Sequence, residues 1–370
     1  MKNGMKAALF AVISAFILSW GSTGGTAAFA ASPSAQPTSF KFRTPFVPDV
    51  NYGPFYVAQE LYWPKLNLDG TALPGKGSAA ALQTVAAGSE QMGYAAVASV
   101  MDGIQEGMPV KIIAVIQRRD PTALIFLKDS GIRELKDVVG KRVGNFPGGV
   151  TGNLLRSALR QNGIDEQNVR MVNVPPGGHV PLLLEKKIDA IVAFFGASDL
   201  SIRCKGYDVG AIPLANVGLN FYGQAVFVNT KWADQVGDEV VTRALLGIIQ
   251  GSIIVKQDPD QTIAILQKLN PQIQFDRAYQ WAEQQTLVQW SWNLESPVLK
   301  NQGFGWIDEA EMAKTQKVLV ESGVLKKEIE IGAYYTNKYL KDPRVHQAAM
   351  ETVRTPLREA PDDVKKQCRL

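Results

Sequence analysis

A glycine-rich turn links a predicted strand and a predicted helix in the sequence KRVGNFPGGVTGNLLRSALRQNG, residues 141–163. The residues before the turn have the pattern of a short strand, and Gly152–Asn162 has that of an amphipathic helix with its apolar side chains on one face. Gly148 and Gly149 let the backbone approach a bound molecule closely, and Thr151 is placed to cap the helix. The free N–H groups of such a helix start favour an anion or a polarised oxygen.

This turn alone does not identify a binding site. The sequence contains neither a GxxxxGK[ST] nor a GxGxxG phosphate-binding pattern. An ordinary strand-to-helix turn in an α/β sheet explains the same residues. The remaining candidates decide between the two interpretations.

The other candidate ligand contacts also lie at the ends of predicted elements, at the sheet edge where open α/β folds bind ligands. Together they would supply aromatic walls, amides and one guanidinium to a small polar or aromatic molecule. Arg118 has a competing interpretation, since the run Arg118-Arg119-Asp120 could be a solvated turn. These candidates are Asn51, Tyr52, Phe55, Tyr94, Gln117, Arg118, Phe194 and Phe195, which join Gly148, Gly149 and Thr151.

Patterns typical of catalysis and metal binding are missing from the sequence. It has no Ser-x-x-Lys, GxSxG or HExxH motif, and two His and two Cys make no zinc ligand set. We therefore expect no enzyme activity, no cofactor and no metal. Cys204 and Cys368 could pair in an exported protein, but Cys368 lies close to the C-terminus and the sequence leaves the pairing open.

The first 30 residues have the pattern of a cleaved signal peptide. Lys2 and Lys6 precede the apolar run Ala7–Trp20, and a small-residue stretch ends in Ala-Phe-Ala at Ala30. The run is shorter than the ~20 residues of a membrane-spanning helix. Cleavage after Ala30 removes two lysines and no acid, so the net charge falls from +4 to +2. Neither nucleic acid nor a membrane surface is an expected partner at that charge.

Strands and helices alternate along the following 200 residues, which favours parallel sheets covered by helices. The apolar runs Val110–Gln117 and Ala123–Leu127 meet at an Asp-Pro turn and predict two antiparallel strands, the second of which could carry the chain into another sheet. Asn220–Asn229 is predicted to return it. After Thr230 the sequence predicts mainly helices, interrupted by an aromatic, loop-like stretch at Trp290–Trp306.

The order of these pieces resembles the substrate-binding proteins of ABC transporters for nitrate, sulfonates, taurine and the pyrimidine precursor of thiamine. The resemblance covers about residues 40–340 and depends on the order and spacing of the pieces. They are Tyr52–Glu60, Ala80–Gly88 with Met92-Gly93-Tyr94, Glu106–Val110, Leu135–Val150, Asp258-Pro259 and Tyr334–Asn337.

The resemblance implies an α/β fold of two Rossmann-like lobes, the type II arrangement of periplasmic binding proteins, with a ligand cleft between them and a helical C-terminal extension. Lobe one would contain residues 39–127 and 225–370, and lobe two residues 128–224. The implied protein is a monomeric periplasmic receptor, not inserted in the membrane after cleavage. It would capture a small organic anion or a heteroaromatic solute for a permease and its ATPase.

Two differences from members of this family argue against a thiamine-precursor ligand and against an enzyme of the synthase type. Thiamine-precursor members carry a Trp- and Glu-bearing signature where this chain reads Phe194–Ser198, and the related eukaryotic pyrimidine synthase has a Cys cluster that is missing here. A same-fold enzyme and a ligand-sensing receptor for a membrane kinase stay open as alternatives.

Overall fold

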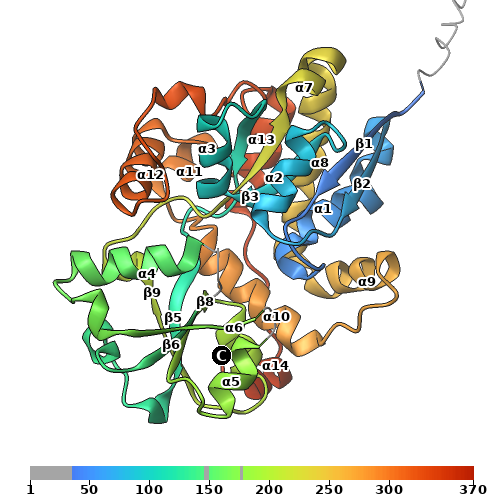
Figure 1. The fold of residues 1–370 in the computed structure, drawn as a ribbon. Helices are drawn as coiled ribbons and strands as arrows, with labels where there is room; N and C mark the ends of the chain where they lie inside the picture. Colours follow the sequence, from blue (N-terminus) through green and yellow to red (C-terminus); the bar gives the residue numbers. More distant parts are fainter. Residues whose placement is uncertain (1–35, 146–149, 176–177) are drawn as a thin grey trace, which may run out of the picture. The chain divides into compact units, whose positions relative to one another are not determined.

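A computed structural model describes residues 36–145, 150–175 and 178–370. The predicted signal peptide, Gly148 and Gly149 lie outside the described residues. Within Pro37–Leu370 the strands form two five-stranded sheets with helices packed around them (Figure 1). This arrangement confirms the predicted fold class.

The first sheet has the strand order β2-β1-β3-β10-β4. β1 is parallel to β2 and β3, whereas β10 is antiparallel to both β3 and β4. The strands consist of β1 Thr38–Arg43, β2 Leu68–Leu73, β3 Met92–Ala96, β4 Val110–Val115 and β10 Gln224–Asn229.

The second sheet has the strand order β7-β6-β8-β5-β9, with β5 antiparallel to β8 and β9. Its strands are β5 Thr122–Leu127, β6 Arg142–Asn145, β7 Arg170–Asn173, β8 Ala190–Phe194 and β9 Val209–Pro213. The predicted antiparallel pairing of the two runs around Asp120-Pro121 is therefore wrong, because β4 and β5 belong to different sheets. The predicted passage into another sheet at this point is confirmed.

The chain passes between the sheets twice, from β4 to β5 and from β9 to β10, and the two crossing segments hydrogen-bond to each other. The Gln117 N–H donates to the Gln224 carbonyl at 3.1 Å, and the Gly223 N–H donates to the Gln117 carbonyl at 2.9 Å. A Cβ on Gly223 would lie 2.7 Å from the Arg119 carbonyl oxygen, so this close approach requires glycine.

The predicted division into lobes places the first boundary near Leu127. The chain leaves the first sheet before β5, at the end of β4, so β5 lies with the strands of residues 128–224. The assignment of residues 39–127 and 225–370 to one lobe and 128–224 to the other otherwise stays a prediction.

One hydrophobic core contains side chains of β1, β2 and β3 together with those of the helices beside them, and we call it the first core. The helix α8 lies at its centre and packs against α1 and α13 (Figure 1). Apolar side chains on several sides of α8 are buried there, which is why it has no continuous polar face. The helices are α1 Gly53–Val57, α2 Ser78–Ala86, α3 Val97–Gln105, α4 Val150–Gln161, α5 His179–Leu184, α6 Ser198–Arg203, α7 Thr230–Val236, α8 Asp238–Gln257, α9 Pro259–Leu269, α10 Arg277–Thr286, α11 Pro297–Gln302, α12 Glu309–Glu321, α13 Pro343–Arg354 and α14 Asp362–Cys368. Two π-helical turns, Ala58–Tyr62 and Leu287–Ser291, extend α1 and α10.

The C-terminal helix α14 is joined to the end of α6 by a disulfide between Cys204 and Cys368. Around it Leu200, Trp281 and Val364 form part of a separate buried cluster. The sequence left this pairing open, because it could not show that the C-terminal tail folds back. Since α6 follows β8 of the second sheet, the disulfide ties the end of the chain to that sheet.

Candidate functional site

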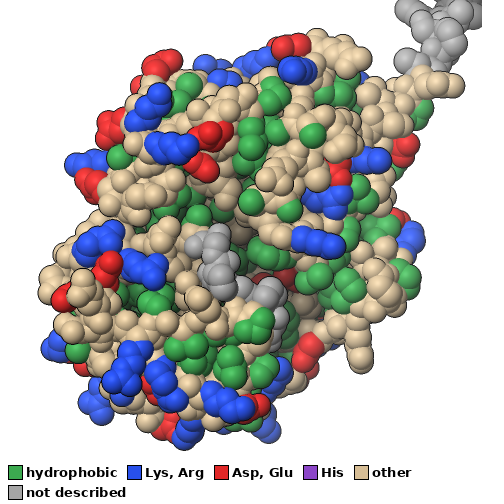
Figure 2. Space-filling model, in the orientation of Figure 1, with side chains coloured by type: hydrophobic (Ala, Val, Ile, Leu, Met, Phe, Trp, Pro, Cys, Tyr) green, Lys and Arg blue, Asp and Glu red, His purple; other side chains and the backbone are tan. Residues whose placement is uncertain are grey.

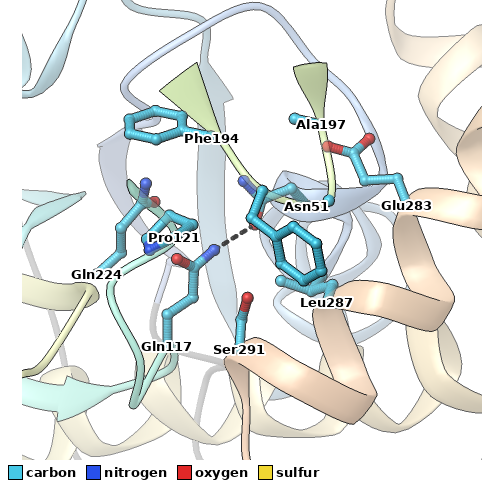
Figure 3. A pocket seen from close by; sticks show the side chains of 11 residues that line it. Asn51, Gln117, Pro121, Phe194, Ala197, Gln224, Glu283, Leu287 and Ser291 are labelled. Carbon is cyan, nitrogen blue, oxygen red and sulfur yellow. Dashed lines mark hydrogen bonds between the residues drawn. The ribbon is translucent and has the colours of Figure 1, made fainter. Parts of the chain in front are cut away.

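A pocket lies where the two crossings, the end of β8 and the α10 region meet (Figure 3). Its empty space is about 340 Å³, including solvent at the open mouth. The residues that line it are Asn51, Gln117, Pro121, Phe194, Phe195, Gly196, Ala197, Gln224, Glu283, Leu287 and Ser291. Four of the predicted ligand contacts, Asn51, Gln117, Phe194 and Phe195, are brought together here.

Amide groups from three segments meet on one side of the pocket. The Gln117 side chain donates from Nε2 to Asn51 Oδ1 at 2.9 Å. Asn51 lies in a 3₁₀ turn whose start is capped by Asp49, so its position is set by local hydrogen bonds. The Oε1 atoms of Gln117 and Gln224 are buried and have no hydrogen-bond partner among the described residues. These two oxygens are therefore available to a ligand that donates hydrogen bonds.

Glu283 of α10 contributes a buried carboxyl group to the other side, directed toward Ala197 (Figure 3). Burial, together with the negative charge of Asp49, raises the pKa of the Glu283 carboxyl well above its ordinary value. Burial likewise raises the pKa of Asp49 to about 7, although the N–H of Tyr52 stabilises its charged form in part. Glu283 lines the pocket and Asp49 does not, and within the described part of the chain neither carboxyl group has a salt-bridge partner.

The aromatic wall comes from the end of β8. Phe194 contacts Phe46 with ring centroids 6.5 Å apart, and Phe195 contacts Trp290 at 5.1 Å, both edge to face. The chain then turns at Gly196, which has a φ of +83° and whose added Cβ would lie 2.7 Å from a methyl group of Thr286. Glycine is needed at this turn both for its backbone angle and for the close approach of α10.

Three predicted aromatic contacts, Tyr52, Phe55 and Tyr94, do not line the pocket. They are buried in the first core, where the Phe55 and Tyr94 rings lie 4.8 Å apart and Phe55 stacks on Phe42. Tyr94 lies in the middle of β3 and Phe55 within α1, not at the strand end and the turn that the sequence predicted, and apolar packing buries both side chains. The three side chains therefore belong to this core and not to the pocket lining.

Arg118 does not line the pocket either. Its guanidinium is buried, donates to the Trp306 carbonyl at 2.9 Å and to Tyr222 Oη at 3.2 Å, and pairs with Glu311. It also lies over the Tyr222 ring, 5.1 Å from the centroid. The predicted ligand contact is thus an interaction that joins the first crossing to the start of α12, and the solvated-turn alternative does not describe it either.

The predicted contacts in the glycine-rich turn cannot be placed, because Gly148 and Gly149 lie outside the described residues. Thr151 is half-buried and is the second residue of α4, which begins at Val150. It is therefore within the first turn and not in the cap position that the sequence predicted.

Sequence reasoning missed the contribution of α10 and its π-helical extension, which supply Glu283, Leu287 and Ser291. The helix is rich in Gln and Glu, and such a pattern normally indicates a solvated face. Here the polar residues are buried: Gln280 accepts from the Val50 N–H at 2.6 Å, and Gln284 donates to the Val255 carbonyl at 3.1 Å. The π-helical turn at Leu287–Ser291 cannot be seen in the sequence.

The described part of the chain shows no group of three or more His, Cys, Asp or Glu side chains able to hold a metal ion. A search of those same residues finds no helix with the length and apolar character to span a membrane. On the face displayed in Figure 2, acidic and basic side chains are interspersed. That face therefore carries no field of a single sign.

Comparison with known proteins places these observations in context. A family model described as NMT1/THI5 like matches residues 49–262. The riboflavin-binding protein RibY of Chloroflexus aurantiacus is 21% identical over 320 residues, which cover 84% of this chain and 89% of the relative. A 4-amino-5-hydroxymethyl-2-methylpyrimidine phosphate synthase of Legionella pneumophila is 25% identical over 294 residues, 78% of this chain and 88% of the relative.

Among solved structures, the periplasmic aliphatic sulphonate binding protein SsuA of Escherichia coli superposes with a TM-score of 0.63 at 14% identity. The match covers 81% of this chain and 92% of that protein. At this identity the likeness concerns the fold, and it agrees with the two-sheet architecture described above.

Proposed function

The chain belongs to the NMT1/THI5-like family, and we propose that it is the solute-binding component of an ABC import system. In this role it captures a small molecule in the pocket between the two sheets and delivers it to a permease that works with an ATPase. The observation that carries the proposal is the pocket itself, which lies against both crossings and takes residues from both sides of them. Such a site can open and close as the crossings bend.

The pocket lining favours a heteroaromatic solute over a small organic anion. No Lys or Arg is among the described lining residues, and Arg118 is engaged elsewhere. An anion would meet the Glu283 carboxyl without a compensating cation. A flat heteroaromatic ring could use Phe194 and Phe195 as a wall and the amides as hydrogen-bonding groups. Riboflavin and the pyrimidine named by the two relatives belong to this broad class.

Export to the periplasm is part of the same proposal. The N-terminal pattern that ends at Ala30 motivates it, and the Cys204–Cys368 disulfide supports it because disulfides persist in oxidising compartments. N-terminal sequencing of the secreted protein should begin near Ala31. A mature form that starts at Met1 and stays with the membrane contradicts export.

A thermal-shift screen tests the binding function. The mature protein is heated with a library of heteroaromatic compounds, sulfonates, nitrate and sugars. A true ligand at a hundredfold excess over its Kd should add about 2.7 kcal/mol of stability. Hits confined to heteroaromatic compounds support the proposal, and a library without any hit contradicts it.

An enzyme of the same fold is the second candidate, and one comparison favours it: the Legionella relative is named as a synthase. The described pocket lining offers one candidate acid or base, the Glu283 carboxyl, but no His, Cys or Lys beside it to complete a catalytic set. Mass spectrometry of a screening hit after prolonged incubation separates the two. An unchanged hit supports the receptor, and stoichiometric or catalytic conversion supports the enzyme.

A further inference from the structure

Among the residues that the structure describes, three side-chain oxygens in the pocket are buried without a hydrogen-bond donor. They are Gln117 Oε1, Gln224 Oε1 and Glu283 Oε2. The three residues are only 2%, 3% and 4% exposed, so solvent cannot satisfy these acceptors well. A buried acceptor that lacks a donor is unfavourable, and native proteins rarely leave several at one place without use. All three residues come from different segments and line the same cavity (Figure 3).

The acidic groups around Glu283 also favour a hydrogen-bond donor at this place, above all a positively charged one. Asp49 and Asp199 both raise the pKa of its carboxyl group by their negative charge, and the Tyr279 hydroxyl opposes them only in part as a hydrogen-bond donor. Arg203 lies 3.6 Å from Asp199, but among the described residues neither Asp49 nor Glu283 has a salt bridge. The corner of the pocket at Glu283 therefore holds several acidic groups close together, and either protons or a bound cation must neutralise them.

We propose that this pocket binds the positively charged nitrogen group of its ligand, an amidinium, an ammonium or a protonated ring nitrogen. The N–H groups of that cation donate to Glu283 Oε2 and to the carbonyl oxygens of Gln117 and Gln224. The flat remainder of the ligand lies against Phe194 and Phe195. This inference rests on the proposed binding function and adds the charge of the solute, which is opposite to that of a sulfonate or nitrate.

A series of three probes of similar shape tests the inference: benzamidine, benzamide and benzoate, which differ mainly in charge. Calorimetric titration of the wild-type protein should give benzamidine an affinity about tenfold higher than that of benzamide. The reason is that hydrogen bonds between a charged donor and a charged acceptor are stronger than those between neutral groups. Benzoate should bind more weakly than either. Tighter binding of benzoate or equal binding of benzamide overturns the inference, as does a failure of benzamidine to bind.

The variant Glu283→Gln keeps the shape of the side chain and removes its charge. It should lower the benzamidine affinity about tenfold while it changes the benzamide affinity by less than about threefold. Glu295→Gln, at an exposed carboxylate that pairs with Lys300, is the matched control and should leave both affinities unchanged. Circular dichroism of each variant checks that it is folded.

Unchanged benzamidine binding by Glu283→Gln overturns the inference. A library in which only anionic or neutral solutes bind overturns the cation assignment and leaves the proposed receptor function in place. A library without any ligand contradicts both, so the two failures can be told apart.

Discussion

Phe46 and Phe194 contact each other edge to face with ring centroids 6.5 Å apart, although one follows a strand of the first sheet and the other ends a strand of the second. Phe46 lies after β1 and is 39% exposed, whereas Phe194 lines the pocket. The contact therefore joins the two sheets next to the pocket. Opening of the pocket by a hinge motion would separate these two rings.

Phe194→Ala should weaken binding of a screened ligand by about 1.5–3 kcal/mol, because it removes both the apolar wall and the contact with Phe46. Phe46→Ala removes only the ring contact with Phe194 and should cost about 0.5–1.5 kcal/mol. Calorimetry on both variants compares the two losses. Equal losses, or a larger loss for Phe46→Ala, would show that Phe194 is not a wall of the binding site.

Arg118→Ala should lower stability and leave ligand affinity nearly unchanged. The substitution deletes the hydrogen bonds to Trp306 and Tyr222 and the ion pair with Glu311. Hydrogen bonds of a charged group contribute about 1.5–3 kcal/mol, and Glu311 is partly solvated, so the free energy of unfolding should fall by roughly that amount. Urea unfolding and calorimetry measure the two quantities. A large loss of affinity with intact stability would return Arg118 to the binding site.

The predicted ligand contacts that line the pocket lie at the ends of elements. Asn51, Gln117, Phe194 and Phe195 were identified because ligands bind beyond the carboxyl ends of strands in α/β folds. The same rule also selected Tyr52, Phe55 and Tyr94, which pack into the core. A predicted strand end indicates the right edge of the sheet, but it gives neither the exact bounds of the strand, since Tyr94 lies within β3, nor the direction in which a side chain turns.

Other features could not be predicted because distant segments determine them. Glu283 and Ser291 come from a Gln-rich helix whose polar face looks solvated until the rest of the fold covers it. The partners of Arg118 lie on residues 222–311, so its role depends on tertiary packing. The short helices α6, α11 and α14 have only six or seven residues each, too few for a clear periodicity. The sequence pattern also predicts a helix at Asn337–Leu340, but those residues form no helix, and α13 starts at Pro343, after the Asp342 cap.

The protein should be more stable in mild acid than at alkaline pH. Burial raises the pKa of Asp49 from 3.8 to about 7, so the folded state holds this proton more tightly than the unfolded state does. Stability from this group is full below pH 3.8 and is lost as the pH rises toward 7. The pKa of Glu283 is also raised, so the stability that this group contributes is likewise lost as the pH rises.

Asp49→Asn keeps a side-chain oxygen for the Tyr52 N–H and removes the titration. The melting temperature of the wild type should fall as the pH rises from about 5 to about 8, and that of the variant should fall less steeply. Asp234→Asn, at an exposed position on α7, is the control and should reproduce the wild-type slope. Identical slopes for Asp49→Asn and the wild type would show that Asp49 is not the titrating group.

Removal of the disulfide should destabilise the protein without unfolding either sheet. Cys204 and Cys368 are 164 residues apart, and a cross-link over a long loop restricts the unfolded chain strongly. The double variant Cys204→Ser, Cys368→Ser should lose about 2–5 kcal/mol in urea unfolding. Under reducing conditions the wild type should lose the same amount. A difference between wild type and variant that persists after full reduction contradicts this account.

Blocking the pocket tests the central claim most directly. Ala197 lines the pocket and is half-buried, so Ala197→Trp should fill the space next to Glu283, whereas Ala310→Trp places the same side chain on the exposed surface of α12. Calorimetric titration with a ligand from the screen should give one site per chain in the wild type and in Ala310→Trp, and no binding in Ala197→Trp. Binding of the ligand by Ala197→Trp with wild-type affinity would contradict the claim that this pocket captures the solute.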